Sequence, residues 1–213
     1  PTVLVTAAGT AIQLLLTASM AYPLSKSNLP GRRIMMSLSV FTLVFSGGMI
    51  PTFLVVKDLG LLDTYWALIL PAAINPFSLI IIKNFFQQLP AELEESAKID
   101  GANELQTLWS AILPLSKPVL ATFALFYAVG IWNDFMSPLL YLNDSSMWTL
   151  QMFLRQVTVA TDLSIVETDP GQLPPAQGIK FAVIVVATLP MLIFYPFLQK
   201  HFAKGMLIGS VKG

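Results

Sequence analysis

Five long apolar stretches restrict the fold of this sequence more than any other feature. They cover residues 3–24, 34–56, 65–82, 119–142 and 181–198. An α-helix needs about 20 mostly apolar residues to cross the hydrocarbon core of a bilayer. Strands of a membrane barrel would alternate apolar and polar residues, and these stretches do not. The pattern predicts an all-α membrane protein, a multi-span helical bundle with five visible spans in one domain over residues 1–213.

The composition agrees with a membrane protein and excludes several other classes. Charged residues make up 11% of the chain, whereas a soluble domain carries roughly 25%. The formal net charge of zero gives no basic surface for nucleic acid. With no Cys and a single His, His201, we expect neither a disulfide nor a metal site. The sequence has no phosphate-binding loop of the form G-x-x-x-x-G-K-S/T, so we expect no cofactor and no ATP hydrolysis on this chain.

Positive charge is unevenly distributed between the two sides of the predicted spans. One side holds nine Lys or Arg residues: Lys26, Arg32, Arg33, Lys83, Lys98, Lys117, Lys200, Lys204 and Lys212. The other side holds three: Lys57, Arg155 and Lys180. Because cytoplasmic segments are enriched in Lys and Arg, we expect the first side, with the C-terminus, to be cytoplasmic. Pro1 then lies outside, which favours one further helix upstream of it.

One segment, residues 90–118, is far more polar than its surroundings and predicts a helical hairpin. Pro90 suits the first turn of a helix, and the acidic residues after it lie near the positive end of the helix dipole. Gly101 is expected to end this helix, because glycine adopts the left-handed conformation found at helix C-termini. Asn103 can cap a second short helix over residues 104–112, which Pro114 and Pro118 would end before the next apolar stretch.

Two short helices with so little core are not stable alone in water. The residues of the hairpin therefore leave two interpretations open. It is either a solvated hairpin at the membrane face or an element that docks on a partner surface.

A signature is present in the hairpin. It is carried by Glu95-Ser96-Ala97, Gly101 and Ala111-Ile112-Leu113-Pro114. It resembles the EAA…G…I-x-LP signature of inner-membrane permease subunits in bacterial binding-protein-dependent ABC importers. Ser96 stands in place of the first Ala of that pattern, and Ala111 in place of the usual Ile.

Two further stretches resemble the carbohydrate-type members of that family. WNDFMSPLLYL, residues 132–142, is similar to the span after the signature in these permeases. KGMLIGSVKG, residues 204–213, resembles the tail of the maltose-permease second subunit and its oligosaccharide relatives. The chain as a whole looks most like permeases for complex or uronate-containing oligosaccharides.

The resemblance implies a function and a set of partners. The fold would be that of a type I ABC importer permease in the bacterial inner membrane, surrounded by lipid. The chain would pass a sugar or oligosaccharide from a periplasmic binding protein to the cytoplasm. A second permease subunit, forming a heterodimer, and two cytoplasmic ATPase subunits holding ATP and Mg would complete the importer.

In this family the hairpin is the element that couples the ATPase to the spans. Closure of the ATPase subunits would be transmitted through it. The residues that match the coupling signature are Glu95, Ser96, Ala97, Asp100, Gly101, Ala102, Leu113 and Pro114.

Residues 143–177 are expected to form a periplasmic loop, since they carry polar residues and several prolines and exceed the length of an ordinary connector. A solvated loop without a partner stays possible from the residues alone. The resemblance implies contact with the binding protein, with Trp148, Gln151 and Arg155 as candidates.

Polar residues inside spans are costly and often functional. The candidates for the translocation path are Trp132, Asn133, Asp134 and Asn75, with Gln13 after them. Asp134 could instead be a span-end residue capped by water or by a neighbouring helix. The main alternative function is a secondary transporter or channel that works without ATP. Such a carrier usually places several ionisable groups at mid-membrane, whereas these spans offer essentially Asp134 alone.

Overall fold

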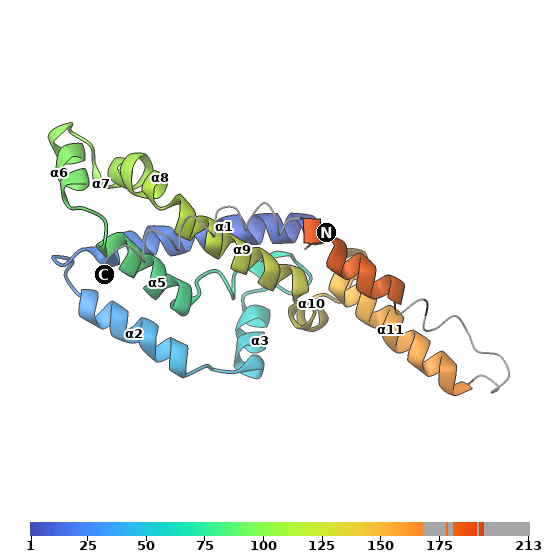
Figure 1. Ribbon diagram of the computed structural model, residues 1–213. Helices are drawn as coiled ribbons and strands as arrows, with labels where there is room; N and C mark the ends of the chain where they lie inside the picture. The colour runs from blue at the N-terminus through green and yellow to red at the C-terminus, as the bar shows by residue number, and fades with distance from the viewer. Residues whose placement is uncertain (168–177, 179–180, 191, 194–213) are drawn as a thin grey trace.

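All regular elements in the described part of the chain are helices, as the apolar stretches predict (Figure 1). The structure is a computed structural model that describes residues 1–167, 178, 181–190 and 192–193, with backbone alone for residues 160–167. The helices are α1 (Thr2–Ser25), α2 (Arg32–Val44), α3 (Met49–Asp58), α4 (Trp66–Ile69), α5 (Pro76–Gln87), α6 (Glu92–Ile99), α7 (Glu104–Thr107), α8 (Leu113–Leu115), α9 (Lys117–Asn133), α10 (Met136–Tyr141) and α11 (Leu150–Glu167). A π-helical turn (Leu108–Ile112), a 3₁₀ turn (Ser145–Met147) and a C-terminal helix (Phe181–Pro190) complete the set.

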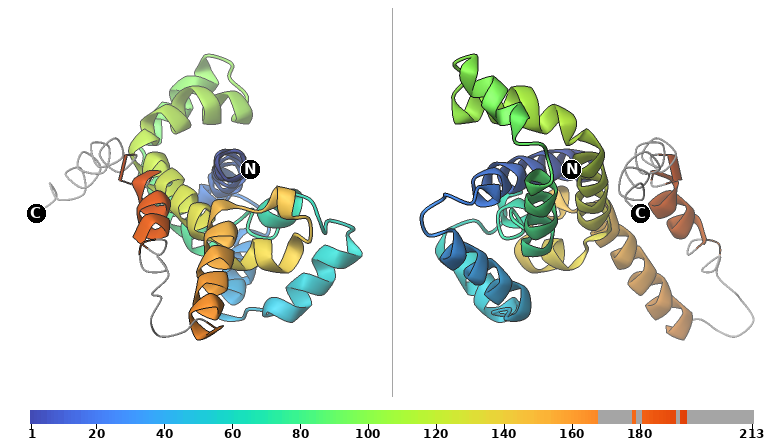
Figure 2. Two further views of the ribbon diagram at one scale, coloured as in Figure 1. Left: turned by 90° about the vertical axis from the view of Figure 1, so that its right-hand side faces the viewer. Right: turned by 60° about the vertical axis from the view of Figure 1, so that its left-hand side comes forward.

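Helix α1 is the centre of the fold, and α5 and α9 pack along it (Figures 1 and 2). The side of α1 that faces them carries small residues such as Ala18 and Ala21, both buried. Gly9 continues this close approach, because a Cβ there would lie 2.8 Å from Ile131 Cδ1 on α9. Small residues let membrane helices come close enough for van der Waals contact, which drives their association where no water is expelled.

The main core lies near the hairpin end of α1. Its buried side chains come from four elements: α1, α5, the π-helical turn and α9. A hydrogen bond of 3.1 Å between Thr17 Oγ1 and Tyr127 Oη ties α1 to α9 inside it. A smaller cluster joins α3, α4 and α10 through Val56, Ala67 and Tyr141.

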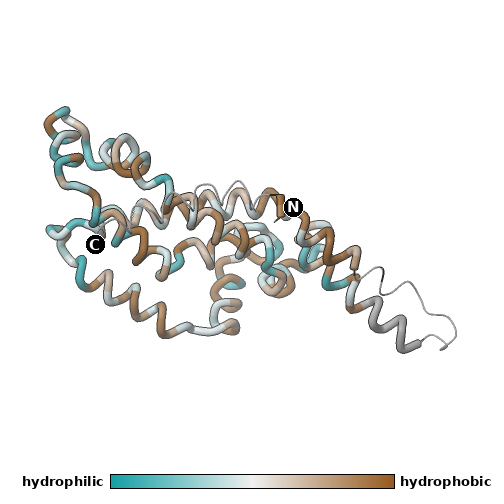
Figure 3. The backbone as a smooth tube through the Cα atoms, in the orientation of Figure 1, coloured by the Kyte–Doolittle hydropathy of each residue, from teal (hydrophilic) through white to brown (hydrophobic). Residues whose placement is uncertain are grey.

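Apolar side chains also cover much of the outer surface (Figure 3). Helix α2 shows this most clearly, with Ile34, Leu38 and Phe41 each more than half exposed. A soluble protein rarely exposes so large a contiguous apolar surface. The outer face of this chain is therefore suited to lipid.

Most of the predicted spans are broken rather than continuous. By length and composition, α1 is the one described helix that can cross a bilayer alone, or one of up to three if each bent pair counts as a span. The stretch 34–56 bends by 117° between α2 and α3. The stretch 119–142 breaks between α9 and α10. The predicted continuous helices are therefore wrong at these places, and the count of five spans stays a prediction.

The breaks have local causes. Gly48 has φ of +86° at the bend between α2 and α3, a conformation that other residues adopt only with strain. In the stretch 65–82, Pro71 and Pro76 flank a non-helical segment between α4 and α5, since proline cannot donate the helical hydrogen bond. The fifth predicted span is helical over Phe181–Pro190, and the rest of it lies outside the described residues apart from residues 192–193.

The segment at residues 143–177, predicted as a periplasmic loop, contains a long helix, and its side of the membrane stays a prediction. Residues Leu150–Glu167 form the long helix α11, and residues 168–177 lie outside the described part of the chain. No Pro or Gly interrupts residues 150–167, whereas Pro170, Gly171, Pro174 and Pro175 all come later. The prolines and the glycine that indicate a loop therefore follow the helix in the sequence and do not lie within it.

The contact between Gly9 and Ile131 gives a first prediction. Gly9→Leu should destabilise the fold by about 1–3 kcal/mol, the usual cost of overpacking a tight interface. Gly130→Leu is the matched control, because Gly130 lines a cavity and a Cβ there meets nothing within 4 Å. Thermal unfolding in detergent measures both. Equal stability of the two variants would contradict the close packing of α1 on α9.

Candidate functional site

The polar hairpin forms with the turn chemistry that its sequence predicts. Helix α6 is followed by Gly101, whose φ of +79° is left-handed. Asn103 caps α7 by accepting a hydrogen bond of 2.9 Å from the backbone N–H of Gln106. The Gln106 side chain accepts in return from the backbone N–H of Asn103, at 2.8 Å. This reciprocal capping box, whose Gln106 half the sequence analysis missed, fixes the start of the second helix.

Of the two prolines expected to end the second helix, Pro114 lies within the helical path, whereas the path ends just before Pro118. The helical path continues from α7 through the π-helical turn into α8, which contains Pro114 in its first turn. The path breaks instead at Ser116, where it turns by 84° into α9.

A polar cluster joins the hairpin to the end of α1. Tyr22 Oη donates a hydrogen bond of 2.8 Å to Glu104 Oε2. Lys98 Nζ lies 3.0 Å from Glu104 Oε1, and Lys26 forms an ion pair with Glu94. The bonds from Lys98 and Tyr22 hold the pKa of Glu104 below its usual value, and Glu104 in turn raises the pKa of Lys98. These side chains attach the hairpin to α1, and the bonded pair Tyr22 and Glu104 lie 82 residues apart in the sequence.

Three large apolar side chains of the hairpin are more than half exposed in the described part of the chain. Ile99 is 86% exposed, Leu105 68% and Trp109 58%. Large apolar side chains exposed on a projecting polar element are typical of a docking surface. We call these three residues the hairpin face.

The residues of the signature divide into two groups. Exposed positions of the hairpin hold Glu95, Ser96, Asp100, Gly101 and Pro114. Partly buried positions hold Ala97, Ala102 and Leu113, the last packed against the main core. The signature thus combines a surface for contact with an anchor in the bundle.

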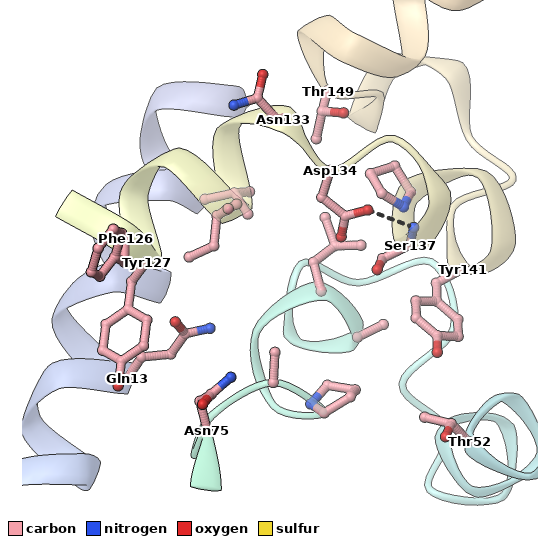
Figure 4. A pocket seen from close by; sticks show the side chains of 18 residues that line it. Gln13, Thr52, Asn75, Phe126, Tyr127, Asn133, Asp134, Ser137, Tyr141 and Thr149 are labelled. Atoms are coloured by element: carbon pink, nitrogen blue, oxygen red, sulfur yellow. Dashed lines mark hydrogen bonds between the residues drawn. The ribbon is translucent and has the colours of Figure 1, made fainter. Parts of the chain in front are cut away.

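A second candidate site is a cavity of about 590 Å³ beside α1 (Figure 4). Four polar residues singled out in the sequence meet there: Gln13, Asn75, Asn133 and Asp134. Five other polar residues line it without any signal in the sequence: Thr52, Tyr127, Ser137, Tyr141 and Thr149. All nine come from α1, α3, α9, α10 and the segments just before α5, α10 and α11, so no spacing in the sequence could have grouped them.

Two of the cavity residues owe part of their position to helix capping. Asp134 Oδ1 accepts from the backbone N–H groups of Met136 and Ser137, at 3.0 and 3.1 Å, and so caps α10. Asn75 Oδ1 accepts from Ser78 N at 3.1 Å and caps α5. Asp134 therefore lies at a span end, where the next helix supplies hydrogen-bond donors to its carboxylate. The residue also lines the cavity.

Gln13 has a different environment. It is 5% exposed, and no described residue hydrogen-bonds its side-chain amide. Buried polar groups are nearly always paired with protein, water or ligand. The Asn75 amide nitrogen and the Tyr141 hydroxyl likewise have no partner among the described residues. The cavity wall thus offers several unused hydrogen-bonding groups.

Trp132, the fourth candidate for the translocation path, does not line this cavity. Its indole N–H donates a hydrogen bond of 3.2 Å to the carbonyl of Ala187 in the C-terminal helix. Trp132 is 7% exposed and so has a packing role between α9 and that helix. Trp132 and its neighbour Asn133 differ in environment because consecutive helical residues point about 100° apart.

The three candidates for binding-protein contact lie near the N-terminus of α1. Leu150 N donates to Thr2 Oγ1 at 2.7 Å, which places the start of α11 at that end. The Gln151 amide lies 3.5 Å from Asn133 Oδ1, and the exposed Arg155 stacks 4.7 Å from the centre of the Phe135 ring. Trp148 is partly buried at the same end.

Comparisons with known proteins identify the family. A family model described as "Binding-protein-dependent transport system inner membrane component" matches residues 13–208. The chain belongs to this family. It is therefore a transporter component, the permease subunit of an ABC importer in the inner membrane.

Individual relatives agree with this assignment. The chain is 68% identical over 213 residues to Protein LplC of Bacillus subtilis (strain 168), covering 99% of this chain and 72% of that protein. It is 60% identical over 216 residues to the polygalacturonan/rhamnogalacturonan transport system permease protein YtcP of the same organism, covering 99% of this chain and 75% of that protein.

A solved structure also matches. It is the crystal structure of a bacterial ABC transporter involved in the import of the acidic polysaccharide alginate. The match has a TM-score of 0.84 and 34% identity, and it covers 94% of this chain and 72% of the other. The predicted all-α fold of a type I ABC importer permease is thereby confirmed.

Asp134 provides a prediction that separates capping from charge. Asp134→Asn keeps an acceptor for the two backbone N–H groups and should leave stability unchanged while lowering transport modestly. Asp134→Ala removes the cap and should cost about 1 kcal/mol of stability. Unfolding in detergent and uptake by the reconstituted importer measure the two effects. Normal uptake by the Asn variant at limiting solute would remove the Asp134 charge from the solute path.

The polar cluster provides a second prediction. Tyr22→Phe should speed amide hydrogen exchange in α6 and α7 by about 2- to 10-fold, the effect of one lost hydrogen bond. Tyr141→Phe, which removes a hydroxyl in the cavity, should leave exchange in the hairpin unchanged. Equal exchange in the Tyr22 variant and the unsubstituted chain would show that this bond does not hold the hairpin.

The same cluster predicts a pH dependence. The lowered pKa of Glu104 means that its stabilisation is present above the ordinary Glu value of 4.5 and is lost as pH falls through the lowered pKa. The raised pKa of Lys98 means that its stabilisation is present below 10.5 and is lost as pH rises through the raised pKa. Protection of the hairpin, corrected for intrinsic exchange rates, should be constant between these limits.

Proposed function

We propose that this permease passes a sugar or oligosaccharide from a periplasmic binding protein to the cytoplasm, driven by ATP hydrolysis on separate partner subunits. The hairpin of residues 90–118 is the coupling element. The observation that carries the proposal is its construction: it is attached to α1 by the polar cluster and presents the three exposed apolar side chains of the hairpin face.

The route of coupling follows the contacts. A partner ATPase subunit seats on the hairpin face, where Ile99, Leu105 and Trp109 would lose their exposure to water. Movement of the hairpin is passed to α1 through Tyr22 and Glu104. Helix α1 packs on α9 and carries residues that line the cavity, so a shift at one end alters the cavity walls.

The partners occupy opposite ends of α1. The hairpin contacts the C-terminal end of α1, whereas Trp148, Gln151 and Arg155 lie near its N-terminal end. A helix of 24 residues is about 36 Å long at 1.5 Å per residue, enough to cross a bilayer. The binding protein therefore meets the periplasmic end, and two ATPase subunits holding ATP and Mg meet the cytoplasmic end. A second, different permease subunit forms a heterodimer with this chain and completes the translocation path. The C-terminus of this chain is cytoplasmic.

The chemistry of the cavity supports a saccharide. The described residues of its lining include no Lys, Arg or His, and the one carboxylate among them, Asp134, is engaged as a helix cap. Unused amide and hydroxyl groups on Gln13, Asn75 and Tyr141 suit the hydroxyl groups of a sugar. Aromatic rings of Tyr127 and Phe126 add apolar surface for the sugar ring. The saccharide-importing relatives point to the same class of solute.

A pair of glycine variants tests the coupling proposal. Gly101 and Gly60 both have left-handed φ, +79° and +67°, and a Cβ at either meets nothing within 4 Å. Asp at each position therefore adds a similar backbone strain, about 1–2 kcal/mol. Only Gly101 lies in the hairpin, so Gly101→Asp should insert normally but lose solute-stimulated ATP hydrolysis and transport. Gly60→Asp should keep both.

The measurements are ATPase activity and uptake by the reconstituted importer, with the amount of retained ATPase subunit as a check on assembly. Full stimulated hydrolysis and transport in the Gly101 variant would show that the hairpin is not the coupling element. Equal loss in both variants would assign the effect to backbone strain and would also overturn the proposal.

A further inference from the structure

A cavity of about 910 Å³ lies between the first turns of α2 and helix α5, and we call it the cationic pocket. Its lining includes three cationic side chains: Arg32, Arg33 and Lys83. The first two come from α2 and the third from α5, so the fold brings together charges that are far apart in the sequence. Among the described residues, no Asp or Glu lines this pocket.

The three cations lack a negative partner in the described part of the chain. The ion pairs found there involve Lys26 and Lys98 instead. Arg32 Nε donates to the carbonyl of Leu24 at 2.8 Å, and Lys83 Nζ donates to Asn84 Oδ1 at 2.9 Å. Both acceptors are neutral, so these bonds orient the cations without compensating their charge.

Burial makes this imbalance significant. Lys83 is 7% exposed and lies close enough to Arg32 for the two positive charges to repel each other. A buried charge without a counter-charge is unfavourable, because it loses hydration and gains no ion pair. An anion between Lys83 and the two arginines would remove both penalties.

The other side of the pocket is apolar. Ile34, Met36 and Val40 line it along α2, and Ile34 is 67% exposed. Helix α2 presents further uncovered apolar residues toward the outside (Figure 3). The pocket therefore has a cationic end that continues into an apolar wall, which fits a ligand with an anionic head and a hydrocarbon tail better than a small ion.

The position of the pocket also fits a membrane lipid. It lies next to the segment after α1, on the same end of the bundle as the polar cluster that holds the hairpin (Figure 1). Helix α2 enters the apolar stretch directly from this end. Cationic residues at such an interface attract the headgroups of anionic lipids.

We propose that the cationic pocket binds the phosphate headgroup of one anionic phospholipid, with its acyl chains along Ile34, Met36 and Val40 of α2. The site is separate from the cavity of the translocation path and from the hairpin face. It does not depend on the coupling role proposed above, because lipid contact is measured without transport.

The absence of Cys in this chain allows a site-specific probe. Ser37→Cys places a fluorescent label in the lining of the pocket, and Ser46→Cys places one at an exposed position after α2. The labelled chain is assembled with cysteine-free partner subunits and reconstituted with brominated phosphatidylglycerol or brominated phosphatidylcholine, which quench on contact. At position 37, brominated phosphatidylglycerol should quench the label at a far lower mole fraction than brominated phosphatidylcholine. At position 46, the two lipids should quench at the same mole fraction.

Charge variants assign the preference to the pocket. Arg33→Gln and Lys83→Gln should each weaken the preference for phosphatidylglycerol about fivefold, the effect of one cation near an anionic headgroup. Lys57→Gln removes an exposed cation outside the pocket and should leave the preference intact. Because Arg33 is exposed, its variant should fold even if loss of the buried Lys83 disturbs assembly.

Three results would overturn the proposal. Equal quenching by the two lipids at position 37 would show that the pocket does not select an anionic lipid. No quenching by either lipid would show that protein covers the pocket and that it holds no lipid. Displacement of brominated phosphatidylglycerol by inorganic phosphate would make it a site for a free anion. A preference that resists phosphate and falls with Arg33→Gln supports the lipid.

Discussion

The packing of α1 against α5 and α9 is the interaction on which the rest of the structure depends. It is close because α1 presents Gly9, Ala18 and Ala21 toward its neighbours. In a bilayer, such contact replaces the hydrophobic effect as the reason for helices to associate. Both candidate sites use this helix, since α1 lines the cavity with Gln13 and holds the hairpin with Tyr22.

The broken spans and the cavity have one physical explanation. Backbone groups in the hydrocarbon core need internal hydrogen bonds, and irregular backbone is tolerated only where protein or a polar cavity surrounds it. The breaks before α5 and α10 both border the cavity, where Asn75 and Asp134 cap the helices that follow. The same interruptions that shorten the spans thus supply polar groups for a solute path.

Local chemistry determined which features could be predicted from the sequence. The left-handed Gly101 and the Asn103 cap depend on a few neighbouring residues, and both are present. The position of Trp132 and the convergence of Arg32 with Lys83 depend on how distant helices pack, for which a single sequence gives no direct signal. The prolines of the segment 143–177 indicate a loop, but all of them lie after residue 167 and therefore outside helix α11.

Cross-linking between the hairpin face and the ATPase subunit tests the central claim most directly. Leu105 and Leu59 are matched in exposure, at 68% and 67%, but Leu59 follows α3 and lies outside the hairpin. A photo-reactive label on Leu105→Cys should link to the ATPase subunit with a yield that changes when ATP binds, and a label on Leu59→Cys should not. Retention of the ATPase subunit with no link from position 105 would contradict the coupling role of the hairpin.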